Sequence, residues 1–139
     1  MAQDPDGSRR QARRAAVMLL YQEDLTGHAM AEIVAQHEAD AGRPLPAYAR
    51  GLIDGVHADG ARLDAEIGAL AEGWTVDRIA PVERAVLRVG LLELDRDDPP
   101  APVAIAEAVA LARRYASPEA GTFVNGILGA AARTRGTGR

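Results

Sequence analysis

The chain has 139 residues, with 16 basic and 20 acidic side chains and a formal net charge of −4. It has no cysteine, which excludes disulfides, thiolate nucleophiles and cysteine metal sites. No apolar run approaches the roughly 18 residues of a membrane span, and none marks a secretory signal, so we expect a cytoplasmic protein without membrane contact. The length suits one domain, and abundant Ala and Leu predict an all-α fold with almost no strand.

The N-terminal third predicts two helices. Residues 1–7 are polar and turn-like, and we expect them to be disordered. Ser8, followed by Gln11, has the pattern of a capping box and predicts a helix that starts at residue 8 and ends at Gly27. A second helix is expected over residues 29–39.

The middle of the chain predicts a helical stretch of uncertain continuity and then a central helix. Apolar residues recur at nearly helical spacing over 52–70, but Gly55 and Gly60 interrupt them, which leaves one kinked helix or two short ones. Residues 82–94, preceded by Pro81, are apolar on nearly all sides. Only four charged side chains break this pattern: Glu83, Arg84, Arg88 and Glu93. A helix of this kind is buried by its neighbours.

Two further helices are expected after a loop over residues 95–102. The first covers about 103–115, and the second is capped by residues 117–119. Residues 133–139 form a basic tail that we expect to be flexible. The sequence thus predicts about seven helices in a single domain over residues 8–132, arranged as two antiparallel bundles that share the central helix.

The last predicted helix carries two features of interest. Phe123 heads its apolar stripe, a position that usually belongs to the core but lies at the outer end here. Asn125 and Gly126 are both poor helix formers. We expect Gly126 to permit close helix packing and Asn125 to satisfy a backbone group at that contact.

The sequence offers little for catalysis. It has no Lys for a phosphate-binding P-loop and no serine elbow. The histidines lack the spacing of metal ligands: His28, His37 and His57. Paired acids stand beside loops or helix ends, where solvated faces explain them. We therefore expect no enzyme activity, no cofactor and no metal.

Four arginines crowd the first predicted helix: Arg9, Arg10, Arg13 and Arg14. They form two i, i+4 pairs of like charge near a helix N-terminus, where both repulsion and the helix dipole disfavour cations. Because this arrangement lowers the stability of the helix, it indicates that the arginines bind an external anion. Guanidinium groups bind phosphate in bidentate geometry. Tyr21 follows two turns after Arg14 and would stack an unpaired base. The alternative is a solvated helix face.

Four motifs resemble the NusB family, in the family's order and over nearly the whole chain, from about residue 9 to residue 132. The first runs from Arg9 to Tyr21 (RRxARxxAVxxLY). The second is PVERAVLR over residues 81–88. The third is VAIAEA over residues 103–108, and the fourth is FVNGIL over residues 123–128.

The resemblance implies an all-helical fold of two bundles without catalysis. NusB proteins bind single-stranded boxA RNA of ribosomal RNA transcripts together with NusE, a small-subunit ribosomal protein. With other Nus factors they help RNA polymerase pass terminators. By position, the four arginines and Tyr21 match the family's RNA-contacting helix, and Glu119 and Phe123 match the RNA side of the last helix. Glu83 matches a position that faces NusE.

The chain also departs from the family pattern. Gln11 and Thr122 stand where relatives often carry basic residues, and Asp4 and Asp6 add negative charge upstream. These differences predict weak binding to RNA alone, with NusE supplying much of the affinity. Some members of the family form homodimers that cover the arginine helix, and the sequence does not distinguish monomer from dimer.

Two other functions remain open from the sequence. One is the NusB-like module of ribosomal RNA cytosine methyltransferases, but that enzyme class needs a catalytic domain with reactive cysteines. The other is a helical interaction protein that binds an acidic protein partner and no RNA. Salt-dependent binding to boxA RNA, but not to scrambled RNA, separates this last function from antitermination.

Overall fold

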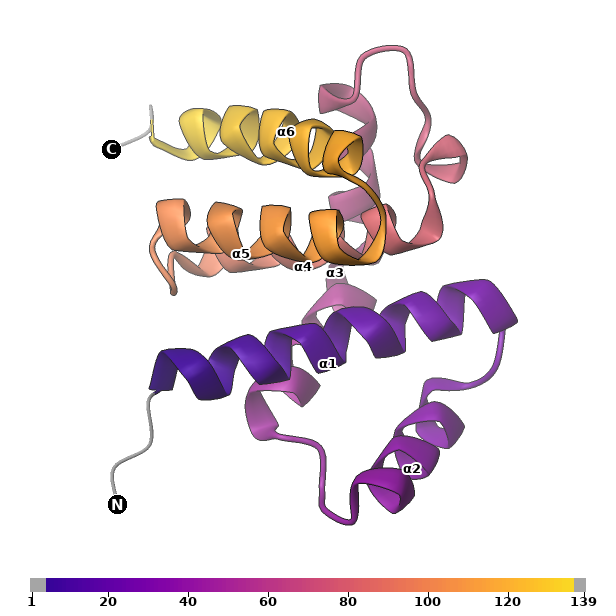
Figure 1. Ribbon diagram of the computed structural model, residues 1–139. Coiled ribbons are helices and arrows are strands. Elements are labelled where there is room, and N and C mark those ends of the chain that lie inside the picture. Colours follow the sequence, from indigo (N-terminus) through magenta and orange to yellow (C-terminus); the bar gives the residue numbers. More distant parts are fainter. Residues whose placement is uncertain (1–4, 137–139) are drawn as a thin grey trace.

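The computed structural model describes residues 5–136, which form six α-helices, one 3-10 helix and no strand (Figure 1). The elements are α1 (Pro5–Thr26), α2 (Met30–Ala41), α3 (Ala47–Leu70), η1 (Val76–Arg78), α4 (Pro81–Arg96), α5 (Ala101–Tyr115) and α6 (Pro118–Gly136). The predicted all-α class is confirmed. Within the described range, no helix combines the length and apolar character needed to span a membrane.

The terminal helices are longer than the sequence predicts. Helix α1 begins at Pro5, one turn before the expected start at Ser8, and α6 continues to Gly136. Proline suits the first turn of a helix because its missing N–H is unpaired there in any case. Residues 5–7 and 133–136 are therefore helical, in contrast to the expected disordered segment and flexible tail. Residues 1–4 and 137–139 lie outside the described part.

Helix α3 is one continuous helix in which Gly55 serves close packing. A Cβ at Gly55 would lie 2.6 Å from Leu92 Cδ2 of α4 and 2.8 Å from Arg96 Nη2. A side chain at this position would require the Leu92 and Arg96 side chains of α4 to move. Gly55, which the sequence analysis treats as an interruption of the helix, therefore lies where α3 crosses α4.

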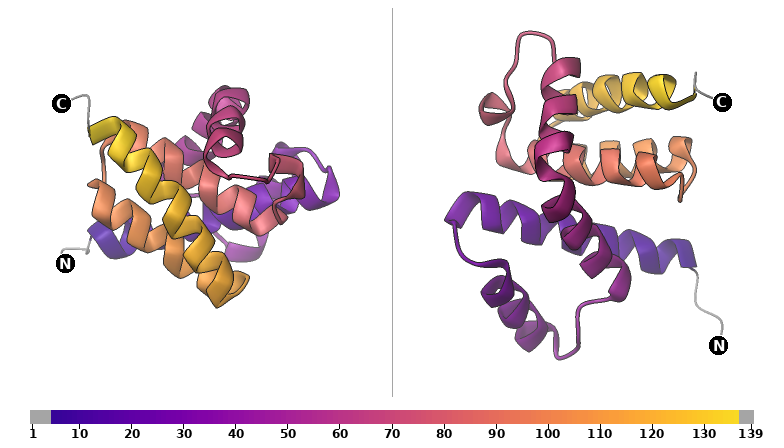
Figure 2. Two further views of the ribbon diagram at one scale, coloured as in Figure 1. Left: turned by 90° about the horizontal axis from the view of Figure 1, so that it is seen from above. Right: turned by 180° about the vertical axis from the view of Figure 1, so that it is seen from behind.

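Helix α4 is the centre of the molecule. Helices α1 and α3 pack on it from the N-terminal half, and α5 and α6 pack on it from the C-terminal half (Figure 2). Leu87 and Leu91 of α4 are completely buried. The predicted central helix shared by two bundles is thus present, and burial on all sides explains why its sequence is apolar all round.

Close approach of α4 and α6 occurs at Gly90, not at Gly126. A Cβ on Gly90 would lie 2.7 Å from Leu128 Cδ1. Gly126 and Asn125 are both exposed, and a Cβ built on Gly126 has no atom of another helix within 4 Å. The prediction that these two residues serve a helix contact is wrong, because the helix phase turns them to solvent.

Candidate nucleic-acid interface

The four arginines of α1 differ sharply in exposure. The Arg10 side chain is 63% exposed and that of Arg9 is 36% exposed, whereas Arg13 is only 4% exposed. Arg13 stands one turn before Ala16 and Val17, on the stripe that packs against α4. The structure therefore separates Arg13 from the surface cluster in which the sequence analysis placed it.

Arg13 belongs to a buried polar cluster. Its Nε and Nη2 donate to the two carboxylate oxygens of Glu93 at 2.7 and 2.8 Å, and Glu93 is completely buried. The Tyr48 hydroxyl donates to the same carboxylate. Burial, followed by the Glu93 hydrogen bond, raises the pKa of Tyr48 to about 12. This bidentate pair joins α1 to α4. Because it buries the Arg13 guanidinium, it does not agree with a direct contact between Arg13 and RNA.

Arg9 and Arg10 are at the surface, but each already forms an ion pair with a carboxylate of this chain. Arg9 donates to both oxygens of Asp98, at 2.8 and 3.2 Å, and stacks over the Tyr48 ring at 4.9 Å. The Arg9 hydrogen bond holds the pKa of Asp98 below its usual range. Arg10 donates through Nε to Glu107 at 2.9 and 3.2 Å. Acids from the α4–α5 loop and from α5 thus compensate the like charges that α1 brings together.

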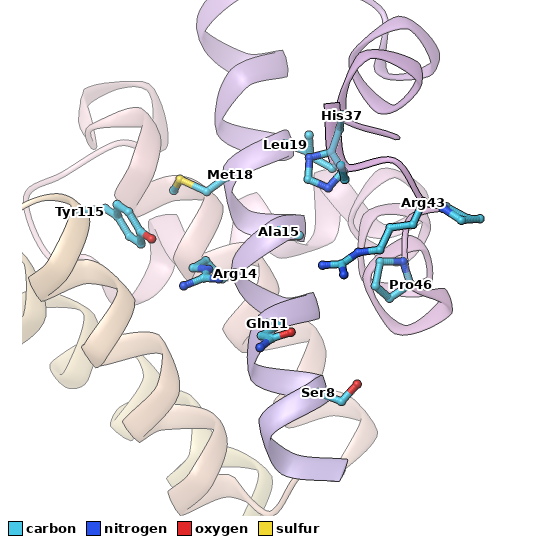
Figure 3. A pocket seen from close by; sticks show the side chains of 12 residues that line it. Ser8, Gln11, Arg14, Ala15, Met18, Leu19, His37, Arg43, Pro46 and Tyr115 are labelled. Atoms are coloured by element: carbon cyan, nitrogen blue, oxygen red, sulfur yellow. The ribbon is translucent and has the colours of Figure 1, made fainter. Parts of the chain in front are cut away.

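Arg14 differs from the other three arginines of α1. In residues 5–136 its guanidinium has no carboxylate partner, and it is half-buried at the edge of a pocket of about 430 Å³ (Figure 3). The pocket lies over the outer face of α1 and also reaches α2, the α2–α3 connection and the end of α5. Arg14 therefore keeps its full positive charge available for an external anion.

Tyr21, Glu119 and Phe123 lie on two different elements. Tyr21 is partly exposed on α1 and packs against the core. Glu119 is exposed and Phe123 is partly buried in the first two turns of α6, where Ser117 Oγ accepts a hydrogen bond from the Ala120 N–H at 3.0 Å. This bond confirms the predicted cap.

Glu83, Glu119 and Phe123 share one groove of about 350 Å³. The α3–α4 connection forms its other side and contributes Trp74, which is 50% exposed with Arg78 stacked over its ring at 5.8 Å. The structure thus places the residue expected to face NusE beside two residues expected to face RNA. None of the four arginines of α1 lines this groove.

Glu83 is a half-buried carboxylate without a cation. Burial raises its pKa, and no basic group within the described range pairs with it. Its neighbours on α4 behave differently: Arg84 pairs with Asp24, and Arg88 pairs with Asp64. Glu83 is therefore an acid of α4 without an ion-pair partner among the described residues.

Sequence reasoning missed Tyr48, Glu93 and Trp74. Glu93 carried a usable signal, since a lone acid in an apolar helix needs a buried cation and Arg13 lies on the matching helix face. Tyr48 and Trp74 gave no comparable pattern, because only the crossing of α3 with α1 and the path of the α3–α4 connection position them.

The geometry defines a helical protein with arginines on the surface of its first helix and, on other elements, an aromatic groove. The sequence comparisons give this class its family. The profile of the NusB family matches residues 10–133, and the chain belongs to this family. The transcription antitermination protein NusB of Thermobifida fusca is 40% identical over 88% of this chain and 87% of that protein. Its counterpart in Rubrobacter xylanophilus is 41% identical over 87% of each chain.

A solved structure shows the same fold with its ligands. It is the crystal structure of the antitermination factors NusB and NusE in complex with double-stranded RNA. The matching chain superposes with a TM-score of 0.79 at 31% identity, covering 91% of this chain and 96% of that chain.

Proposed function

We propose that this chain is a transcription antitermination factor that binds boxA RNA of ribosomal RNA transcripts together with NusE and helps RNA polymerase read through terminators. Family membership, the antitermination proteins among its relatives and the structural likeness to a NusB–NusE–RNA complex support this function. The protein would act in the cytoplasm with the other Nus factors, and it would do so by binding, without catalysis or a cofactor.

The observation that carries the proposal is the surface of α1. Arg9, Arg10 and Arg14 all reach it, and a phosphate would replace the Asp98 and Glu107 carboxylates as the partner of the first two. Such an exchange keeps the guanidinium groups paired while it frees two acids, so the RNA affinity of the isolated chain would be modest. Arg13 would act indirectly, by fixing α1 against α4.

The groove beside α6 would bind the rest of the complex. Phe123 is partly exposed and offers a ring for a stacked base, with Glu119 at its side to accept a hydrogen bond from a base edge. Tyr21 would add a second stacking surface on α1. Glu83, half-buried and lacking a cation, would pair with a basic group of NusE.

Binding to labelled RNA tests this function. Fluorescence anisotropy would be measured with single-stranded boxA RNA, a scrambled strand and a double-stranded form, each with and without NusE. We expect boxA to bind more tightly than the scrambled strand, with NusE increasing the affinity. Replacing both Arg9 and Arg10 by Ala should weaken binding, whereas Arg133→Ala, an exposed arginine of α6, should not. Equal binding of boxA and scrambled RNA with NusE present would contradict the proposal.

A further inference from the structure

The outer face of α1 forms a saddle-shaped pocket, here called the α1 saddle (Figure 3). Its floor consists of small or neutral side chains at helical spacing, among them Ser8, Gln11 and Ala15. Arg14 stands on one flank, with Tyr115 at the end of α5 facing it, and Arg43 reaches toward α1 from the other flank. A chain-like ligand that crosses α1 would therefore meet a guanidinium group on each side.

The charge of the saddle is unusual for this protein. The chain carries 20 acidic residues, but none of those that the structure describes lines the saddle, while Arg14, Arg43 and His37 all do. In the described part of the chain, neither Arg14 nor Arg43 has a carboxylate partner, in contrast to Arg9 and Arg10. An anion in the saddle would pair with these two guanidinium groups without displacing an acid.

A second groove continues the saddle toward α5. This groove, of about 380 Å³, lies between α1 and α5 and shares Gln11 and Arg14 with the saddle. It also contains Arg10 with its partner Glu107, and Arg114, which stacks over the Tyr115 ring at 5.2 Å. Together the two grooves form one path that runs from α5 across α1 to the α2–α3 connection.

We propose that the α1 saddle is a phosphate-binding site for the RNA backbone. The strand would cross α1 over Gln11 and Ala15, with Arg14 and Arg43 each holding one phosphate in bidentate geometry. This site rests on the proposed RNA binding and adds Arg43, on the α2–α3 connection, to the RNA-contacting residues. Because no acid among residues 5–136 pairs with them, Arg14 and Arg43 contribute more to the salt dependence of binding than Arg9 and Arg10 do.

The salt dependence of RNA binding tests the saddle. Affinities for single-stranded boxA RNA with NusE would be measured over a range of salt concentrations for wild type, Arg14→Ala combined with Arg43→Ala, and the control Arg133→Ala. Each lost single-strand phosphate contact lowers the log–log slope by about 0.7, so the double variant should lose about 1.4. Arg43→Lys should keep the slope because it keeps the charge. Thermal melting checks that the variants fold, as expected for side chains without intramolecular ion pairs.

The outcomes separate the saddle from the proposed function. If wild type binds boxA RNA and the double variant keeps the wild-type slope, as the control does, the saddle proposal is overturned and the antitermination function stands. If the double variant instead loses NusE binding measured without RNA, the saddle is a protein-binding surface, which also overturns the proposal. If wild type binds no boxA RNA with NusE present, the proposed function fails and the saddle proposal fails with it.

Discussion

Adjacent arginines on one helix have opposite roles in this protein. Arg13 is buried against Glu93, while Arg14 lies at the surface pocket without an acid. Consecutive helical residues point about 100° apart, so one residue faces α4 and the next faces outward. The sequence cluster looks uniform, but it contains a packing residue beside ligand-binding candidates.

Arg13→Ala should destabilise the protein far more than Arg14→Ala. Removing Arg13 leaves the buried Glu93 carboxylate without its cation, which costs about 3–5 kcal/mol. Removing Arg14 breaks no ion pair and should change stability by less than about 0.5 kcal/mol. Urea unfolding measures both.

Replacing both members of the buried pair provides the control for this prediction. Arg13→Met combined with Glu93→Leu removes both charges at similar volume and should recover most of the lost stability. Equal stability of the two single alanine variants would contradict the role assigned to Arg13.

Glu83→Gln should raise stability at neutral pH while it weakens binding to NusE. The raised pKa of Glu83 means that the folded chain binds this proton more tightly than the unfolded chain does. Its stabilising contribution is therefore present at low pH and lost as pH rises through the raised pKa. The Glu83→Gln variant has no carboxylate at this position and does not lose this stability. The difference in melting temperature, variant minus wild type, should therefore increase from acid to neutral pH.

Titration of the Glu83→Gln variant with NusE completes this test. A variant that binds NusE as tightly as wild type would show that the partner of Glu83 lies elsewhere. A melting temperature difference that does not change with pH would contradict the unpaired carboxylate.

At the scale of elements, some helical glycines allow two helices to pack closely, whereas others face open space. Gly55 of α3 and Gly90 of α4 lie at crossings where a Cβ would overlap a neighbouring side chain. Gly126 of α6 has open surroundings. All three glycines stand in helical sequence patterns, and nothing in the local pattern ranks them, because contact depends on a neighbouring helix that the local sequence does not show.

Gly90→Ala and Gly126→Ala should therefore change stability in opposite directions. At Gly90 the new methyl group would meet the buried Leu128, and we expect a net loss of about 1–2 kcal/mol despite the better helix propensity of alanine. At Gly126 the same change should stabilise the protein by about 0.5–1 kcal/mol. Denaturant unfolding of both variants measures the difference, and a stabilised Gly90 variant would contradict the close approach of α4 and α6.

For the whole molecule, the central position of α4 couples the two halves. Helices from both halves pack on α4, so neither bundle can unfold while the other keeps its core. Unfolding should therefore be a single cooperative transition. The α1–α4 ion pair between Arg13 and Glu93 adds a polar link to this apolar coupling.

Trp74, the chain's only tryptophan, provides the test of cooperativity. It lies on the α3–α4 connection beside α6, away from the α1–α2 hairpin. Leu20→Ala in α1 should lower the denaturant midpoint of the Trp74 fluorescence transition as much as that of circular dichroism. A Trp74 transition that stays at the wild-type midpoint would show that the two halves unfold independently.

The sequence alone determined the all-α class, the central helix and the family, because these depend on local periodicity and on motifs contiguous in the chain. It also identified α1 as the basic helix and Glu83 as a polar position on a buried helix. Only the tertiary structure decided that Arg13 is buried, that Arg9 and Arg10 hold acids, and that Arg14 and Arg43 flank one pocket. Each of these facts joins residues far apart in the chain, and helix crossing sets which side chains meet.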